Sequence, residues 1–235
     1  MAGEIPEEWR ERLASAELVR ELTPAAREDL LAAAEPRRAT RRSVLFAAGD
    51  PAETLYLLVS GRIKLLRGNA EGQEVIVRFL GPGELLGGVA ALPGARYPAT
   101  AEVAEDAELV AWGRTVLAPA LARHPELTTA ILGIVARRMG DVQGQLQELA
   151  TERVARRVAR ALLRLAAQHG RKIADGVLID FPLSRQSLAE LTGTTLFTVS
   201  RLLSAWESEG TLRAGREEVT ILAPHALVRI AEDLP

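Results

Sequence analysis

The sequence has no cysteine and no long apolar run. The missing cysteine excludes disulfides, cysteine-bound zinc and cysteine-bound iron–sulfur clusters. Apolar stretches are interrupted by Arg, Glu or Gly well before the roughly 18 residues that a membrane-spanning helix needs. The opening segment, MAGEIPEEWRERLASAE, is acidic and lacks the apolar core of a secretory signal. We therefore expect a cytoplasmic protein that has no membrane partner.

Catalytic motifs are also missing from the sequence. It offers no metal-ligand cluster, no nucleophile elbow and no phosphate-binding glycine loop that is followed by lysine. The glycine-rich segment GPGELLG at 81–87 lies between predicted strands, and it lacks the helix that opens a dinucleotide-binding loop. We expect that the protein is not an enzyme.

Positive and negative charges are nearly balanced, and the net charge is −2. Residues 151–235 hold 12 basic and 10 acidic residues, whereas residues 1–150 hold 17 basic and 21 acidic residues. This asymmetry is too small to indicate a nucleic-acid partner. The arrangement of individual arginines must supply that argument instead.

Hydrophobic periodicity predicts two short helices, over 6–16 and 24–34, and then a β-rich region. Short apolar runs separated by turns of Gly, Pro, Asn or Asp are typical of an antiparallel sandwich or barrel. The interior of such a roll is a plausible ligand site. The predicted strands are 44–46, 55–59, 62–67, 74–79, 99–102 and 107–112.

A long helical period begins at Pro125 and continues to about Thr151. The apolar positions after Leu127 follow one another at steps of three or four, which is close to a heptad seam. One interpretation is a helix that covers the preceding roll, and the other, which the narrow stripe favours, is a coiled coil between two subunits. Glycines at 140 and 144 weaken this helix by about 1 kcal/mol each. The predicted dimer interface contains Ile131, Val135, Met139, Val142, Leu146 and Leu149.

The remaining residues predict a separate domain. It has a helix over 152–169, a strand over 176–182, helices over 184–191 and 196–209, and a hairpin over 211–222. The fold class is therefore α+β. We expect an N-terminal β-roll domain at 1–124 that senses an effector, a dimerisation helix at 125–150, and a winged helix-turn-helix domain at 151–235 that binds DNA.

The segment LSRQSLAELTGTTLFTVSRLLSAWESEGTL at 183–212 carries the main functional signal. Ser184 is a suitable N-cap, and Gly193 permits the left-handed turn that sets two helices at a steep angle. Thr194 or Thr195 is placed to cap the second helix. This combination of caps, a glycine turn and a following hairpin predicts a helix that enters the major groove of DNA.

Residues near the start of the second helix are the candidates for reading base sequence. Arg201 is expected to bind a guanine through two hydrogen bonds, and Thr198 and Ser200 to contact a phosphate or a base edge. Thr195, at the start of this helix, is also a predicted DNA contact. Phe197 can offer only an apolar contact, for example with a thymine methyl group. Three residues of the first helix are expected to fix the register of the protein through phosphates: Ser184, Arg185 and Gln186.

The chain resembles the cyclic AMP receptor/FNR superfamily of bacterial transcription regulators from about Phe46 to Ala231. The resemblance rests on Gly49-Asp50, LYLLVSGRIKLL at 55–66, GPGELLG at 81–87, YPATAEVAEDAEL at 97–109, HPEL at 124–127 and VSRLL at 199–203. It implies a β-roll sensor, a long dimerisation helix and a winged helix-turn-helix. It also implies a homodimer that binds palindromic double-stranded DNA and activates transcription by contacting RNA polymerase.

Departures from the family pattern bear on the effector. Members that bind cyclic AMP have a glutamate where this chain has Gly88, and an arginine where it has Ala99. We therefore expect no cyclic AMP, because a buried phosphate without a cationic partner is unfavourable. The resemblance still places an effector pocket in the GELLG and YPATAE segments, lined by Gly83, Glu84, Leu85, Gly87, Gly88, Arg96, Thr100 and Ala101.

Three further interpretations remain open. The segment YPATAE is similar to that of members that sense nitric oxide through haem, for which the axial ligand would come from His124, His169, His225, Met139 or a tyrosine. Some members act without any ligand, and a small-molecule module without DNA binding is a third reading.

The family often has a glutamate at the position of Phe197, so we expect an altered operator sequence.

Overall fold

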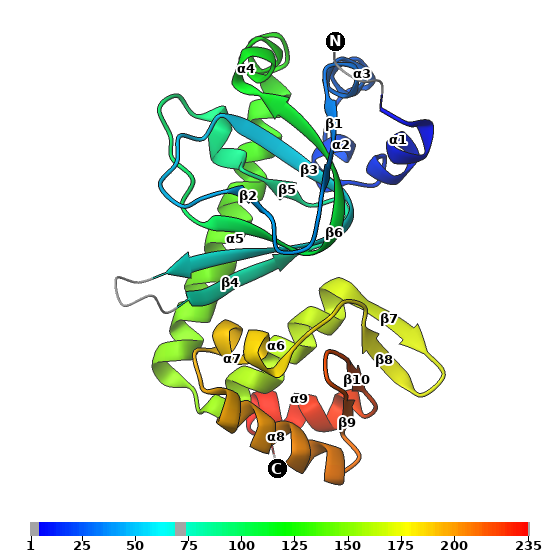
Figure 1. Ribbon diagram of the computed structural model, residues 1–235, viewed down its shortest axis with the longest axis vertical. Coiled ribbons are helices and arrows are strands. Elements are labelled where there is room, and N and C mark those ends of the chain that lie inside the picture. Colours follow the sequence, from blue (N-terminus) through cyan, green and yellow to red (C-terminus); the bar gives the residue numbers. More distant parts are fainter. Residues whose placement is uncertain (1–4, 69–73, 235) are drawn as a thin grey trace. The chain divides into compact units, whose positions relative to one another are not determined.

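The computed structural model describes residues 5–68 and 74–234, and it divides into two compact units (Figure 1). Of these residues, the first unit contains 5–67 and 77–141, and the second contains 68, 74–76 and 142–234. The boundary falls inside one long helix, after Asp141. Among the described residues, no helix is both long enough and apolar enough to cross a bilayer.

Three helices open the first unit: α1 (Glu7–Leu13), α2 (Glu17–Arg20) and α3 (Pro24–Ala32). The predicted helix over 6–16 therefore ends early, and a separate short helix follows it. Helix α3 starts with a proline at its first turn, and the Thr23 hydroxyl accepts a hydrogen bond from the Ala26 amide at 3.3 Å.

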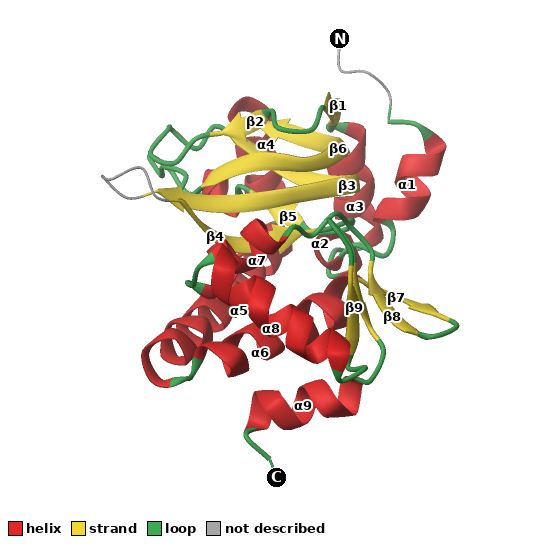
Figure 2. Ribbon diagram, turned by 60° about the horizontal axis from the view of Figure 1, so that its bottom comes forward, coloured by secondary structure: helices red, strands yellow, loops and turns green. Residues whose placement is uncertain are grey.

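The sheet of the first unit is antiparallel and forms the predicted roll. Figure 2 shows strands β2, β6 and β3 side by side. The main path is β1-β6-β3-β4, with β2 paired to β6 and β5 paired to β3. The elements are β1 (Glu35–Ala39), β2 (Val44–Phe46), β3 (Thr54–Gly68), β4 (Glu74–Leu80), β5 (Leu85–Leu86), the 3-10 helix η1 (Gly88–Ala91) and β6 (Thr100–Gly113).

Two pairs of predicted strands are single long strands. The runs at 55–59 and 62–67 join in β3, and the runs at 99–102 and 107–112 join in β6. Irregular register between Leu58 and Ile63 allows the paired strands to bend without breaking. Gly61 lies at this bend with φ +85°, and a Cβ at this position would lie 2.2 Å from the Asp106 carbonyl oxygen.

The core of the first unit joins the helices to the sheet. Leu13, Leu55, Leu58 and Trp112 are almost completely buried in one apolar cluster. The Trp112 indole nitrogen donates a hydrogen bond to the Leu30 carbonyl at 2.7 Å, which ties β6 to α3. Helix α4 (Arg114–Arg123) follows the sheet and leads into α5 (Pro125–Thr151).

The second unit contains the predicted winged helix-turn-helix. Its helices are α6 (Val154–His169), α7 (Arg185–Thr192), α8 (Leu196–Ser208) and α9 (Pro224–Glu232). Its antiparallel sheet has the order β7-β8-β10-β9. The strands are β7 (Gly170–Ile173), β8 (Gly176–Ile179), β9 (Leu212–Ala214) and β10 (Val219–Ile221), of which β7, like α9, was not predicted.

Candidate nucleic-acid interface

Capping and a glycine turn set the angle between α7 and α8, as the sequence predicts. The Ser184 hydroxyl accepts a hydrogen bond from the Ser187 amide at 3.0 Å and so caps α7. Helix α7 ends at Gly193, which has φ +59° and ψ +47°. Only glycine adopts this left-handed conformation without strain, so the turn depends on this residue.

A threonine hydroxyl caps the start of α8. The Thr195 hydroxyl accepts a hydrogen bond from the Thr198 amide at 3.2 Å, and the two hydroxyls lie 3.0 Å apart. Thr195, rather than Thr194, is therefore the cap. The hydroxyls of Thr195 and Thr198 hydrogen-bond to each other on a surface that is exposed to solvent.

Helix α8 has one buried side and one exposed side. Val199, Leu203 and Trp206 are buried and pack α8 into the second unit. Phe197 and Arg201 lie on the opposite side, because each residue of a helix turns by about 100°. Arg201 is exposed, and it forms no hydrogen bond or ion pair with any described residue. Its guanidinium is thus available to a base edge.

Arg185 has a role that the sequence did not reveal. Its guanidinium donates hydrogen bonds to the carbonyl oxygens of Ala214 and Gly215, at 3.4 and 3.3 Å, and so holds the β9–β10 turn against α7. Gln186 is exposed and donates to Glu190 at 2.7 Å. Direct phosphate binding by Arg185 remains a prediction, and it would compete with the contacts that position the turn.

Our sequence-based predictions did not include two arginines at the β9–β10 turn. Arg213 on β9 and Arg216 in the turn are exposed, and neither pairs with another described residue. The Glu207 carboxylate fixes the turn by accepting a hydrogen bond from the Ala214 amide at 3.1 Å. Both arginines lie at or next to a turn that follows the predicted recognition helix. This position in the sequence could have identified them as candidates.

Arg157 joins three backbone carbonyl groups at the base of the helix-turn-helix. It donates to Thr192 and Gly193, each at 3.2 Å, and to Glu152 at 2.9 Å. These bonds connect the turn between α7 and α8 with the turn that joins α5 to α6. A guanidinium suits this position, because its several fixed donors can satisfy more than one carbonyl at once.

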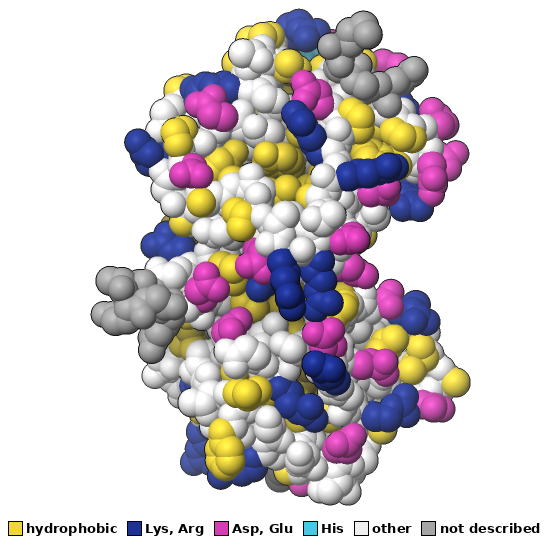
Figure 3. Space-filling model, viewed as in Figure 1, with side chains coloured by type: hydrophobic (Ala, Val, Ile, Leu, Met, Phe, Trp, Pro, Cys, Tyr) yellow, Lys and Arg dark blue, Asp and Glu magenta, His cyan; other side chains and the backbone are white. Residues whose placement is uncertain are grey.

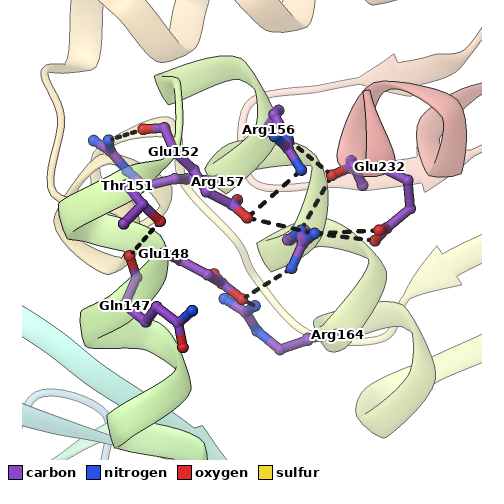
Figure 4. A network of polar contacts seen from close by, with 10 residues as sticks. Gln147, Glu148, Thr151, Glu152, Arg156, Arg157, Arg164 and Glu232 are labelled. Carbon is purple, nitrogen blue, oxygen red and sulfur yellow. Dashed lines mark hydrogen bonds and ion pairs between the residues drawn. The ribbon is translucent and has the colours of Figure 1, made fainter. Parts of the chain in front are cut away.

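A chain of ion pairs surrounds this junction (Figure 4). Glu148 accepts a hydrogen bond from Arg164 at 2.6 Å. Arg160 lies 3.4 Å from Glu152 and 3.2 Å from Glu232. The side chains of Glu148 and Glu152 are mostly buried, so solvent screens these pairs less than fully exposed pairs. The network links the end of α5 to α6 and α9.

Charges of both signs are interspersed on the face seen in Figure 3, where blue and magenta side chains alternate over the second unit. This distribution agrees with the small charge imbalance of the sequence.

Helix α5 carries two apolar stripes rather than one. Its first turns face the sheet of the first unit, where Leu127, Ala130, Ile131 and Ile134 are buried. A second stripe is exposed wholly or in part and repeats at alternating steps of three and four residues, the spacing of a coiled-coil seam. This stripe consists of Leu132, Val135, Met139, Val142, Leu146 and Leu149.

The predicted seam therefore needs a correction at its start. Ile131 is only 1% exposed and belongs to the core of its own subunit, so Leu132 takes the first place in the exposed stripe. Val135 is partly buried against the same core. Met139 and Leu146, at 64% and 66% exposed, are the main apolar side chains available to a second subunit. One face of α5 thus covers the roll, and the exposed face leaves the predicted pairing of two subunits as a prediction.

Most side chains of the predicted effector pocket already have partners inside the roll. Leu85 and Ala101 are buried in the core. The Glu84 carboxylate accepts hydrogen bonds from Arg78 and from the Gly81 amide, both at 2.7 Å. Arg138 on α5 lies near this pair, and burial lowers its pKa to about 10, which keeps it protonated at neutral pH.

The remaining predicted pocket residues also contact their own unit. Arg96 donates to the Gly49 carbonyl at 2.6 Å, and the Thr100 hydroxyl accepts from the Ala48 amide at 3.0 Å. Gly83 lies near Ala16, and a Cβ at Gly87 would lie 2.7 Å from the Thr54 carbonyl oxygen. At Gly88, a Cβ would lie 3.1 Å from Val135 Cγ2, so α5 packs closely on this position.

Aromatic side chains fill one part of the roll. The rings of Phe46 and Tyr97 stack with centroids 3.8 Å apart. The Tyr97 hydroxyl donates to the Thr54 carbonyl at 2.8 Å and accepts from the Thr54 amide at 3.0 Å. Burial raises the pKa of Tyr97, because the ionised phenolate would lose its hydration. Tyr97 is thus a structural link between β3 and the loop before β6.

The arrangement of a β-roll, a long helix with an exposed seam and a winged helix-turn-helix defines a class of protein, the DNA-binding transcription regulators. Comparison with known proteins identifies the family to which the chain belongs. Residues 36–124 match the cyclic nucleotide-binding domain family, and residues 156–230 match the Crp-like helix-turn-helix domain. The chain belongs to the CRP/FNR superfamily, as the sequence predicts.

Relatives at moderate identity cover most of the chain. The cyclic AMP receptor protein of Thermus thermophilus is 35% identical over 187 residues, which are 80% of this chain and 83% of the relative. The global nitrogen regulator of Synechococcus elongatus is 32% identical over 191 residues, with 80% and 85% covered. The structure of the c-di-GMP responsive global regulator CLP from Xanthomonas campestris has a TM-score of 0.73 at 25% identity, covering 85% of this chain and 99% of that one.

Proposed function

We propose that this protein is a homodimer that binds palindromic double-stranded DNA in a sequence-specific manner and activates transcription through RNA polymerase. The observation that carries the proposal is the exposed side of α8, where the guanidinium of Arg201, which pairs with no residue that the structure describes, lies opposite the buried stripe. Residues near the start of such a helix reach base edges in the major groove.

The exposed stripe on α5 supports the dimer. Parallel packing of two such stripes would bury Met139, Val142 and Leu146, which are otherwise in contact with water. A symmetric dimer presents two copies of α8, and these require half-sites about one helical turn, or roughly 34 Å, apart. The operator must then be palindromic.

Cyclic AMP does not fit the residues of the roll. At Gly88, where a carboxylate would be needed for the ribose, α5 leaves no room for a longer side chain without movement of Val135. Ala99 has no charge for a phosphate, and the Arg96 guanidinium is held by the Gly49 carbonyl. We therefore propose that the protein responds to a different signal or acts without a ligand.

Haem receives no support from the candidate axial ligands in the first unit. His124 Nε2 is hydrogen-bonded to Asp29 at 2.9 Å, and the Tyr97 hydroxyl is engaged by Thr54. Met139 is exposed on the α5 stripe. Their geometry suits structural roles and the subunit interface.

Selection of duplexes from a random DNA library by the purified protein tests the proposal. We expect enrichment of a two-fold symmetric sequence that binds one dimer, and the logarithm of the affinity should fall linearly as the logarithm of the salt concentration rises. Arg201→Ala should lose about 1–3 kcal/mol of discrimination at one guanine of each half-site. Arg153→Ala, which changes an exposed arginine outside the recognition helix, is the matched control. Failure to enrich any sequence would overturn the proposal.

A further inference from the structure

Phe197 is the most exposed large apolar side chain among the described residues, at 76%. It occupies the second position of α8, directly after the cap at Thr195 and the neighbouring Leu196. Fixing a phenylalanine ring in water gives no folding energy, because the hydrophobic contribution comes from area removed from water. The ring is therefore free to contact a partner outside the chain.

Helix geometry places Phe197 with the base-reading residues. Phe197 and Arg201 are four residues apart, so they share one side of α8, opposite the buried Val199 and Leu203. Leu196 lies three residues before Val199 and so falls near the packed side, which explains its lower exposure of 48%. Phe197, rather than Leu196, thus faces outward with Arg201.

The chemistry of the ring restricts what it can recognise in the major groove. A phenylalanine side chain neither donates nor accepts a conventional hydrogen bond, so it cannot distinguish the polar edges of the base pairs. The C5 methyl group of thymine is the one apolar feature that natural base pairs present there. An aromatic ring in the major groove can therefore discriminate between bases through this methyl group.

We propose that Phe197 is a specificity-determining residue that reads a thymine through its C5 methyl group. This proposal rests on the proposed DNA-binding function. The rise from Phe197 to Arg201 along α8 is about 6 Å. Base pairs are stacked about 3.4 Å apart, so the thymine lies within about two base pairs of the guanine that Arg201 reads.

Replacing that thymine with deoxyuridine in the selected operator tests the proposal. Deoxyuridine removes the methyl group and retains the pairing and the O4 acceptor. Loss of one methyl contact should weaken binding about three- to fivefold in one half-site and about tenfold or more in both. Deoxyuridine in place of a thymine outside the two half-sites is the control, and it should leave affinity unchanged.

A second pair of duplexes separates the methyl group from the hydrogen-bonding edge. Cytosine at this position, with guanine opposite, should weaken binding, and 5-methylcytosine should recover most of the methyl contribution despite its different polar edge. Recovery by 5-methylcytosine supports apolar reading. Equal binding of both cytosine duplexes overturns it.

The variant Phe197→Ala connects the effect to the ring. It should bind the thymine and deoxyuridine operators with equal affinity, whereas Phe197→Leu should retain part of the preference. Circular dichroism should show the folded state, because Phe197 contributes nothing to the core. If the alanine variant keeps the full preference for thymine, or if it binds every duplex as tightly as the original protein, Phe197 does not read DNA and the proposal fails. Specific binding by the original protein without a deoxyuridine effect would overturn this inference alone, whereas no specific binding at all would overturn the proposed function as well.

Discussion

Leu149 at the end of α5 lies against Gly193 in the turn of the helix-turn-helix. A Cβ at Gly193 would lie 2.8 Å from Leu149 Cδ2, closer than real Cβ contacts allow. Leu149 also belongs to the exposed stripe of α5, so one side chain contacts the turn and borders the surface available to a second subunit. Arg157 holds the same turn through its carbonyl groups.

Gly193→Ala should destabilise the second unit. The alanine would adopt a left-handed backbone conformation, which costs about 1–2 kcal/mol, and its Cβ would also displace Leu149. Thermal denaturation should show a lower melting temperature. Gly144→Ala is the control, because no atom lies within 4 Å of a Cβ placed there, and it should stabilise α5 by up to about 1 kcal/mol.

The double variant Gly193→Ala with Leu149→Ala separates the two causes. Removing the Leu149 side chain should relieve the steric part of the penalty and leave the backbone part. If the double variant shows only the sum of the two single effects, the Leu149 contact contributes no steric penalty, contrary to our expectation.

Leu146→Glu should weaken the dimer. Two acidic side chains would face each other across the seam that we propose, where each leucine now offers an apolar surface. Sedimentation analysis should show a shift toward monomer, and operator affinity should fall with it. Gln147→Glu adds the same charge to the next residue of α5, away from the stripe, and should remain dimeric. A dimeric Leu146→Glu protein would contradict the proposed interface.

Arg216→Ala should weaken binding to all duplexes rather than change the preferred sequence. Arg216 lies in the wing turn, where we expect it to neutralise a phosphate. The slope of log affinity against log salt should become shallower by about 0.9 for each phosphate contact that is lost. Arg201→Ala should instead alter base preference. Loss of discrimination at a single base in the Arg216→Ala protein would reverse the two roles.

Asp29→Asn should lower stability near neutral pH and have no effect in strong acid. The hydrogen bond to His124, together with the nearby Arg123, holds the pKa of Asp29 below its ordinary value of 3.8. A carboxyl with a lowered pKa in the folded protein contributes stability above its unfolded pKa, and the contribution is lost as pH falls through the folded pKa. Chemical denaturation from pH 7 to pH 2 should therefore show a stability gap that closes. Asp175→Asn, at an exposed position, is the control, and a gap independent of pH would contradict the assignment.

Local patterns predicted the elements of the helix-turn-helix well. The helix caps and the left-handed turn involve only residues that are close together in the sequence. The roles of Ser184, Gly193 and Thr195 can therefore be recognised from the sequence. Long strands were harder to predict, because β3 continues through Gly61, and a glycine in a run of apolar residues indicates a break as readily as a bend.

Long-range contacts explain where the site predictions differ from the structure. Arg185 is a predicted phosphate ligand in the sequence, and the structure adds the carbonyl oxygens of Ala214 and Gly215 as its partners within the chain. Ile131 and Leu132 are both apolar neighbours on α5. The sheet of the first unit covers one of them and leaves the other exposed, which periodicity alone does not decide.

The caps and turn of the helix-turn-helix and the absence of cysteine chemistry could be recognised from the sequence, because they depend on residue type and short spacing. Tertiary packing was needed to show which face of α5 stays exposed, and that the Arg157 guanidinium holds the turn between α7 and α8. Those properties arise from packing between segments that lie far apart along the chain, where burial and hydrogen-bond geometry are set by partners that local sequence does not specify.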